Sequence, residues 1–251
     1  MIPKVIHYCW FGRKALPPLA TKCIESWKRY LPDYEIKEWN EDNFDVNVIP
    51  YTQEAYASKK YAFVSDYARF WILYNFGGIY FDTDVEIIEP INDIIEIGPF
   101  MGCERDVREA LKEETMVSVN PGLGMGITVN HEICKKMMNI YAGLDFPTEC
   151  DKGKTIVHYT TNLLMEEGLM VNEGTQVIDG IYIYPKAYFC PYNHITGRIH
   201  TTPKTKTIHH YSGSWMQKSF IERLKETIQP FIAETILLKW HDFKMGRSIN
   251  K

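Results

Sequence analysis

The hydrophobic positions in the first forty residues switch from strand-like to helix-like spacing and back. A continuous apolar run at residues 5–10 predicts a buried strand. Hydrophobic side chains then recur every three or four positions from about residue 18 to residue 30, which predicts a helix, and residues 34–39 alternate as a second strand. This β-α-β opening predicts a mainly parallel sheet with helices packed on it.

An acidic triplet follows the next helix and strand. One long helix is predicted from about residue 53 to residue 76, ending at Gly77-Gly78, where the chain needs a residue with positive φ. Residues 79–81 form a short apolar strand, and Asp82-Thr83-Asp84 stands where that strand ends. Because open α/β sheets bind ligands beyond the carboxyl ends of their strands, the triplet marks a candidate site.

Further strands and helices are predicted after the triplet. Strands are expected at residues 117–120, 181–185 and 207–211, and helices at residues 131–144, 155–167 and 219–245. The charged stretch at 105–115 is expected to be a surface helix or mobile loop. Gly122, Gly124 and Gly126 lack the strand-helix context of a dinucleotide motif and are expected to form a flexible loop. The predicted class is α/β, with one Rossmann-like domain over residues 1–218 and a helical, basic tail over residues 219–251.

Charge and composition narrow the function. The 251 residues carry a formal net charge of -4, which argues against a general nucleic-acid binder, since phosphate backbones require a basic surface. A small polyanionic ligand stays open because a metal ion can supply positive charge locally. No apolar run is long enough to span a membrane, and we expect no signal peptide, because the first residues lead directly into a predicted strand. Six cysteines without metal-site or disulfide spacing predict buried thiols in a reducing cytosol.

The acids of the triplet suit a divalent cation. Mg²⁺ and Mn²⁺ prefer oxygen ligands and are often held by one or two carboxylates plus substrate phosphates. Asp82, Asp84 and Glu86 repel one another, and a cation would relieve that repulsion. Such triplets also occur by chance in solvated turns, so the preceding helix matters. Asp66 and Arg69 share one face of that apolar helix, either as a plain ion pair or as charges that bind a ligand.

Three motifs, in order over residues 1–215, resemble the DXD-containing sugar transferases. This family includes yeast-type initiating α-mannosyltransferases and many bacterial capsular-polysaccharide enzymes. The motifs are Ile2–His7 with Trp10-Phe11-Gly12, Ser65–Arg69 followed by Leu73-Tyr74 and Gly77–Val85, and His209–Trp215. The glucosylating domains of large clostridial toxins are similar at a greater distance.

The resemblance implies a GT-A fold, a retaining transfer and a Mn²⁺ (or Mg²⁺) cofactor. It implies a catalytic set of Asp66, Arg69, Asp82 and Asp84. Asp84 is the expected main metal ligand, and Asp82 contacts both the metal and the ribose. His210 is the expected third ligand, with His209 less favoured, because of its offset from Trp215. An imidazole ligand suits Mn²⁺ better than Mg²⁺, which makes Mn²⁺ the first choice.

The resemblance also implies a donor-binding set. Its members are Tyr8, Trp10, Asp66, Arg69, Tyr80, Asp82, Asn120, Ser212, Gly213, Ser214 and Trp215. Trp10 would stack on the base, and Asn120 would face the sugar near the acceptor. Gly153 with Thr160 or Thr161 is similar to an acceptor-site segment, but Lys154 replaces the usual proline. Residues 103–116 or 211–216 are expected to close over the site.

We therefore expect a retaining glycosyltransferase that moves a hexose or N-acetylhexosamine from a nucleotide sugar, with UDP-sugars preferred, to a glycan or lipid-linked glycan acceptor. Bacterial surface polysaccharide synthesis is the expected setting, in the cytoplasm. A GDP-mannose-dependent mannosyltransferase stays open, as does a phosphatase of the aspartyl-phosphate type, which also carries a D-x-D-x-[TV] pattern. The complete acid set argues against a non-catalytic carbohydrate-binding module, and the absence of delivery domains against a toxin. The tail is expected either to pack on the domain or to dock peripherally on the inner face of the membrane.

Overall fold

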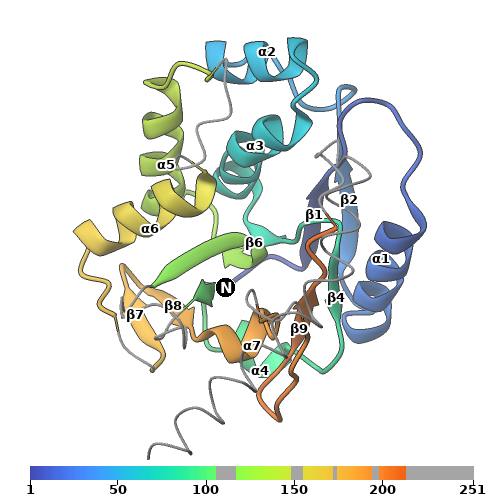
Figure 1. Cartoon of the computed structure of the whole chain (residues 1–251), viewed down its shortest axis with the longest axis vertical. Helices are drawn as coiled ribbons and strands as arrows, with labels where there is room; N and C mark the ends of the chain where they lie inside the picture. The colour runs from blue at the N-terminus through green and yellow to red at the C-terminus, as the bar shows by residue number, and fades with distance from the viewer. Residues whose placement is uncertain (106–116, 148–154, 172–173, 194–197, 213–251) are drawn as a thin grey trace, which may run out of the picture.

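The computed structural model describes residues 1–105, 117–147, 155–171, 174–193 and 198–212. The central strands are β1 (Val5–Cys9), β2 (Glu35–Trp39), β3 (Gly78–Tyr80), β5 (Phe100–Arg105), β6 (Ser118–Ile127), β7 (Gln176–Ile178) and β8 (Ile181–Tyr184). They form one sheet in the order β2-β1-β3-β6-β5-β8-β7 (Figure 1). Strands β1, β2, β3, β5 and β8 run in one direction, and β6 and β7 run in the other. The predicted α/β class with a mainly parallel sheet is confirmed.

Helices cover both faces of the sheet (Figure 1). One hydrophobic core contains residues of α2 (Pro50–Ala57), α3 (Tyr61–Phe76), α5 (Glu132–Ala142) and α6 (Ile156–Glu166). The second core contains residues of α1 (Pro18–Tyr30), α4 (Asn92–Ile95) and α7 (Lys186–Phe189). Alternate residues of one strand enter different cores: Tyr8 faces the second core and Cys9 the first, as the period of a strand requires.

A separate two-stranded sheet lies beside the acidic triplet. It pairs β4 (Val85–Ile87) with β9 (Thr207–His209) in antiparallel register, with Val85 opposite His209. Helix α1 holds this sheet in place: the Trp27 indole N–H donates to the Val85 carbonyl, and Ser26 Oγ accepts from the Ile87 amide. Two motifs far apart in the sequence therefore lie side by side.

The single helix predicted from residue 53 to residue 76 is wrong, because the chain forms α2 and α3 with a break between them. Lys59 has φ 57°, and the amides of Lys59 and Lys60 donate to the carbonyls of Tyr56 and Ala55. This is the hydrogen-bond pattern of a Schellman motif, in which the left-handed residue is usually glycine. A lysine at that position carries no helix-stop signal in the sequence.

The flexible loop predicted at Gly122, Gly124 and Gly126 is also wrong, because all three glycines lie inside the buried strand β6. A Cβ atom on Gly124 would lie 2.8 Å from the ring of Phe81, and one on Gly122 would overlap the Asp82 carboxylate. These glycines let neighbouring side chains approach the backbone of β6 closely, which is one of the known reasons for a glycine inside a strand.

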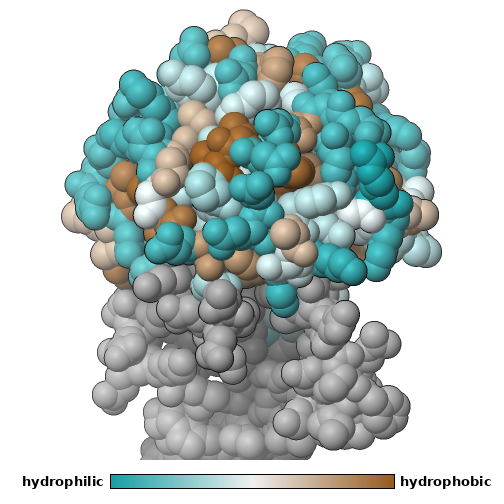
Figure 2. Space-filling view, turned by 90° about the horizontal axis from the view of Figure 1, so that it is seen from above, coloured by the Kyte–Doolittle hydropathy of each residue, from teal (hydrophilic) through white to brown (hydrophobic). Residues whose placement is uncertain are grey.

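Other parts of the predictions fall outside the described residues. The tail at 219–251, the stretch at 106–116 and Cys150 belong to this group. Five cysteines are described, and all are buried free thiols, as expected: Cys9, Cys23, Cys103, Cys134 and Cys190. In the described part of the chain, no helix is both long enough and apolar enough to cross a membrane. The face in Figure 2 is mostly hydrophilic, with hydrophobic residues in small separate groups.

His7 ties three parts of the sheet together from a buried position. Its Nε2–H donates to the Gly77 carbonyl at 2.9 Å, and its Nδ1 accepts from the Trp39 indole N–H at 3.0 Å. Both bonds require the neutral imidazole with its proton on Nε2. Gly78 allows β3 to lie this close to β1. It has φ 104°, and a Cβ atom there would lie 2.6 Å from the Val5 carbonyl oxygen.

Acid should destabilise the protein through His7. Burial lowers the pKa of His7 from 6.5 to about 4. Between these values the unfolded chain binds a proton that the folded chain does not, so stability is lost as pH falls from about 6.5 to about 4. We expect a loss of about 3 kcal/mol from this residue across that window. Urea unfolding of the wild type and His7→Gln at pH 7, 5 and 4 measures it, since glutamine can replace both hydrogen bonds without titrating. Equal acid losses in the two proteins would contradict the assignment.

Candidate active site

The acidic triplet is fixed at the carboxyl end of β3 by main-chain hydrogen bonds. The Phe81 amide donates to the His7 carbonyl of β1, and the Asp82 amide donates to the Gly122 carbonyl of β6 at 3.0 Å. The Val85 amide donates back to the Asp82 carbonyl, which closes a tight turn. The neighbouring strands therefore set the position of both acids, at the sheet edge where ligands bind in this class of fold.

Arg69 connects helix α3 to the triplet. Its Nη2 donates to Asp66 Oδ1 at 2.9 Å, and its Nη1 lies 3.3 Å from Asp82 Oδ1. The guanidinium carbon lies 4.7 Å from the centre of the Tyr80 ring, which adds a cation-π contact. The Arg69 side chain is only 4% exposed. The structure thus brings four of the predicted site residues, Asp66, Arg69, Tyr80 and Asp82, into one cluster around the buried guanidinium.

Burial and neighbouring charges shift the pKa values of Asp66 and Arg69 in this cluster. Burial raises the pKa of Asp66 to about 7; Arg69 opposes this rise and Asp82 adds to it. Burial alone would lower the pKa of Arg69, but the attraction of Asp82 and its neighbours outweighs it and raises the pKa, so the guanidinium stays charged. The Arg69 cation therefore faces the Asp82 carboxylate and an Asp66 carboxyl that is partly protonated near pH 7.

Asp84 is held from the other side by the closing motif. The His209 Nε2–H donates to Asp84 Oδ1 at 2.9 Å, and the amide and hydroxyl of Ser212 both donate to Asp84 Oδ2, at 2.8 Å and 2.9 Å. Burial alone would raise the pKa of Asp84, but these hydrogen bonds outweigh it and hold the pKa well below its usual range. Burial likewise opposes protonation of His209, and the bond to Asp84 reverses this and raises its pKa.

His210, the histidine favoured by the sequence, contacts a different acid. Its Nε2 lies 2.9 Å from Glu86 Oε2, which also accepts from Lys22 Nζ at 2.8 Å. Successive side chains of a strand point to opposite faces, so only one of the paired histidines can face Asp84, and here it is His209. The offset from Trp215 does not encode this choice. A metal role for either histidine stays a prediction.

The possible metal ligands at the triplet fit a cation that is shared with a bound diphosphate. No three His, Cys, Asp or Glu side chains of the described residues come together as a metal-binding group. Two carboxylates from Asp82 and Asp84, completed by phosphate oxygens, are nevertheless a common arrangement for Mg²⁺ and Mn²⁺. His209 presents a buried Nδ1 atom without a hydrogen-bond partner among the described residues, while its Nε2 is engaged by Asp84.

The other predicted donor-binding residues lie around this centre or outside the described part. The Tyr8 hydroxyl donates to Glu38 Oε2 at 2.7 Å, and the Trp10 indole N–H donates to the Lys14 carbonyl at 2.6 Å. Trp10 follows β1, so it lies at the same end of the sheet as the triplet. Gly153, Gly213, Ser214 and Trp215 lie outside the described residues, as does most of each predicted closing loop.

Asn120 forms hydrogen bonds with Gly122 and Glu104, two residues that were not predicted as part of the site. Asn120 Oδ1 accepts from the Gly122 amide at 2.8 Å, and its Nδ2 donates to Glu104 Oε2 at 3.0 Å. The Tyr211 hydroxyl donates to the same oxygen of Glu104 at 3.3 Å. Sequence reasoning missed Glu104 and the role of Gly122. The alternate spacing of the glycines was the one usable signal, since it matches the period of a strand.

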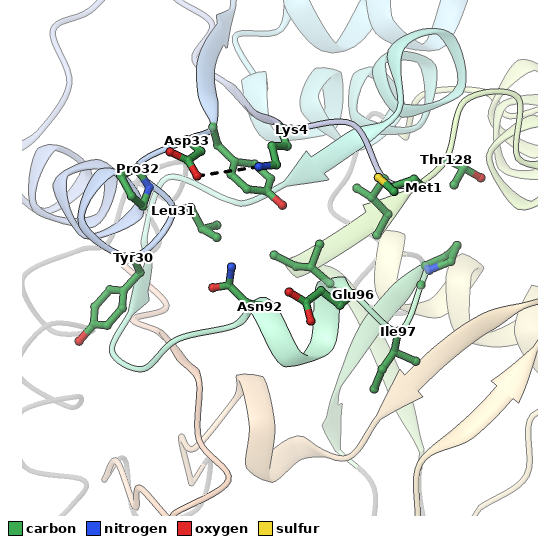
Figure 3. Close-up of a pocket in the computed structure, with 15 residues that line it drawn as sticks. Met1, Lys4, Tyr30, Leu31, Pro32, Asp33, Asn92, Glu96, Ile97 and Thr128 are labelled. Atoms are coloured by element: carbon green, nitrogen blue, oxygen red, sulfur yellow. Dashed lines mark ion pairs between the residues drawn. The ribbon is translucent and has the colours of Figure 1, made fainter.

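A cavity of about 480 Å³ lies at the opposite end of the sheet (Figure 3). Lys4, which precedes β1, and Thr128, which follows β6, belong to its lining, together with Tyr30, Asp33 and Glu96. It therefore opens at the amino ends of β1 and β3, whereas the acids lie at the carboxyl ends. The cavity is separate from the candidate active site.

Residues 17–100 match the family model described as the glycosyltransferase sugar-binding region containing DXD motif. This region contains Asp66, Arg69, Asp82 and Asp84. The resemblance to DXD-containing sugar transferases is confirmed for it. The expected GT-A class agrees with the mainly parallel sheet and with the triplet after β3.

Individual relatives match shorter segments. The chain is 33% identical over 106 residues to an uncharacterized glycosyltransferase of Acanthamoeba polyphaga mimivirus, covering 40% of this chain and 42% of that protein. It is 27% identical over 111 residues to inositol phosphoceramide mannosyltransferase 1 of Schizosaccharomyces pombe, covering 40% and 33%. The chain thus spans less than half of the length of either relative. A solved glycosyltransferase involved in the glycosylation of the major capsid of PBCV-1 has 10% identity and a TM-score of 0.46, covering 92% of this chain and 100% of that one.

Proposed function

We propose, because residues 17–100 match the glycosyltransferase sugar-binding region containing DXD motif, that this chain transfers a sugar from a nucleotide sugar to a glycan or lipid-linked glycan acceptor. The transferred unit is a hexose or an N-acetylhexosamine, and UDP-sugars are the preferred donors. The observation that carries the proposal is one cluster of charged residues: the buried Arg69 guanidinium contacts both Asp66 and Asp82, and His209 holds the Asp84 carboxylate two residues along the chain from Asp82.

The cluster carries groups that suit a sugar diphosphate. Arg69 Nη1 is buried and makes no well-directed hydrogen bond within the described residues, so it can donate to an oxygen of the donor once the groups that cover it move aside. Asp66 lies on the far side of the guanidinium and can accept from a sugar hydroxyl. Asp82 and Asp84 would hold Mn²⁺, or Mg²⁺, together with the diphosphate. When bound, the cation supplies positive charge that offsets the charge of the leaving diphosphate.

The proposed reaction is a transfer with retention. The acceptor oxygen forms a bond to the anomeric carbon on the face from which the bond to the diphosphate oxygen breaks. The proton of the acceptor hydroxyl passes to the leaving phosphate, and Arg69 stabilises the negative charge that develops there. Asp84 and Asp82 keep their positions during this step because main-chain and side-chain hydrogen bonds hold them in advance.

Two alternatives belong in the same test. One relative is named a mannosyltransferase, so GDP-mannose is the second donor to consider. A phosphatase of the aspartyl-phosphate type would need a lysine and a further acidic pair close to its first aspartate. In the described part of the chain, the charged side chain paired with Asp82 is that of Arg69. This contact favours transfer over phosphate-ester hydrolysis.

A donor panel tests the proposal directly. We expect one UDP-sugar to bind and to be hydrolysed slowly in the absence of acceptor, with Mn²⁺ present, and turnover to stop when EDTA removes the metal. Calorimetry measures binding, and release of UDP or GDP measures turnover. Turnover of GDP-mannose alone would replace the donor but keep the reaction class. If no nucleotide sugar bound and phosphomonoesters were hydrolysed instead, the phosphatase alternative would stand.

A further inference from the structure

Strand β5 carries an acid that the proposed reaction has not yet used. Glu104 lies at a register shift: Cys103 pairs with Val119 and Arg105 with Ser118, so no residue of β6 lies opposite Glu104 in the strand register. This is the pattern of a β-bulge, which turns one side chain out of the regular alternation of the strand. Bulges of this kind are common beside active sites, where they aim a side chain at a neighbouring element.

Glu104 accepts hydrogen bonds from two sides of the site. Its Oε2 accepts from Asn120 Nδ2 at 3.0 Å and from the Tyr211 hydroxyl at 3.3 Å. A carboxylate accepts only, so Tyr211 donates to it, and the Cys190 thiol 3.1 Å away donates to the Tyr211 oxygen. Asn120 belongs to β6, whereas Tyr211 follows β9. Glu104 therefore joins the central sheet to the closing motif.

Tyr211 needs such support, because it has the left-handed backbone φ of 48°. A non-glycine residue in this region costs free energy and persists only where its surroundings hold it. Its ring lies 4.1 Å from that of His209 and 5.2 Å from that of Tyr192, between ring centres. The next residue, Ser212, donates both its amide and its hydroxyl to Asp84. The conformation of Tyr211 thus decides whether Ser212 reaches Asp84.

We propose that Glu104 is a positioning residue that, through the Tyr211 hydroxyl, holds His209 and Ser212 against Asp84. The role of Glu104 in donor turnover rests on the proposed function. The hydrogen-bonded link that runs from Glu104 through Tyr211 to the residues bound to Asp84, called the tie below, does not rest on it. Loss of the tie leaves the left-handed turn at Tyr211 without one of its anchors, and the hydrogen bonds from Ser212 to Asp84 then open more often.

Hydrogen exchange of the nucleotide-free protein tests the tie without any substrate. The amides of His210 and Ser212 donate to the Asp84 carbonyl and carboxylate, so they report on this contact. We expect Glu104→Met and Tyr211→Phe each to speed their exchange by about tenfold, and the double variant to add little further, because each single variant already removes the bond from Tyr211 to Glu104. Glu104→Gln keeps an acceptor oxygen and should stay within about threefold of the wild type.

Donor turnover supplies the second readout. The same two variants should lower kcat/KM by about tenfold, as expected for loss of an outer partner of a ligand-binding group, with Glu104→Gln rescuing most of it. Glu35→Met, which changes an exposed acid on β2, is the matched control and should alter neither readout. Additive effects in the double variant, or a glutamine variant as impaired as methionine, would overturn the proposal. A wild-type protein that acts on no nucleotide sugar would contradict the proposed function. The exchange rates would still show whether Glu104 holds Tyr211 and Ser212 in place.

Discussion

Asp84→Asn is expected to lower donor turnover on the order of 10³-fold while the protein stays folded. Both oxygens of Asp84 accept hydrogen bonds, one from His209 and one from Ser212. An asparagine amide offers one acceptor, so its NH₂ group must face either the imidazole N–H or the Ser212 amide, and one of these contacts becomes donor against donor. The negative charge that would help to hold the cation is lost in the same step.

Initial rates over a Mn²⁺ titration measure this loss, and thermal unfolding shows that the fold persists. The matched control is Asp33→Asn, which removes the charge of an exposed acid at the opposite end of the sheet. It should leave the rates unchanged. A variant at position 84 that keeps more than about one tenth of the wild-type rate would remove Asp84 from the centre of the mechanism, because partner groups of a reacting centre seldom contribute so little.

The sequence predicted the elements whose signals are local. The strand at residues 5–10, the helix at 18–30 and the short strand before the triplet follow from hydrophobic spacing alone, and all are found within one or two residues. The break at Lys59 was not predictable in this way. It depends on a lysine that adopts the left-handed conformation, and nothing in the side chain of lysine favours that conformation.

The candidate site shows the same division between local and long-range information. Of the expected catalytic set, Asp66, Arg69 and Asp82 lie in contact, because a helix face and a strand end meet there. Their catalytic role stays a prediction. Motif spacing favoured His210 over His209, whereas His209 is the histidine that contacts Asp84, because that contact depends on how β9 pairs with β4. Glu104 could not be predicted for a similar reason: a bulge directs its side chain, and bulges arise from the pairing of two strands.

Gly122→Ala is expected to lower turnover on the order of 10²-fold through Asp82, although Gly122 has no side chain to contribute. A Cβ atom at this position would overlap Asp82 Oδ2 and would lie 2.8 Å from Asp82 Cγ. The Asp82 amide is also bonded to the Gly122 carbonyl, so the two backbones cannot simply move apart. The carboxylate must therefore turn away from its place beside Arg69. Overpacking of this kind costs about 1–3 kcal/mol of stability.

A stability cycle separates this effect from general damage to β6. In an Asp82→Ala background the overlapping carboxylate is absent, so the added methyl group should cost much less stability than it does in the wild type. Gly143→Ala is the matched control, because a Cβ atom there meets its nearest neighbour, the Ile140 carbonyl oxygen, at an ordinary 3.6 Å. It should change neither stability nor turnover noticeably. Equal stability losses from Gly122→Ala in both backgrounds would mean that the glycine serves the packing of the strand, and that Asp82 is positioned by Arg69 and the main chain alone.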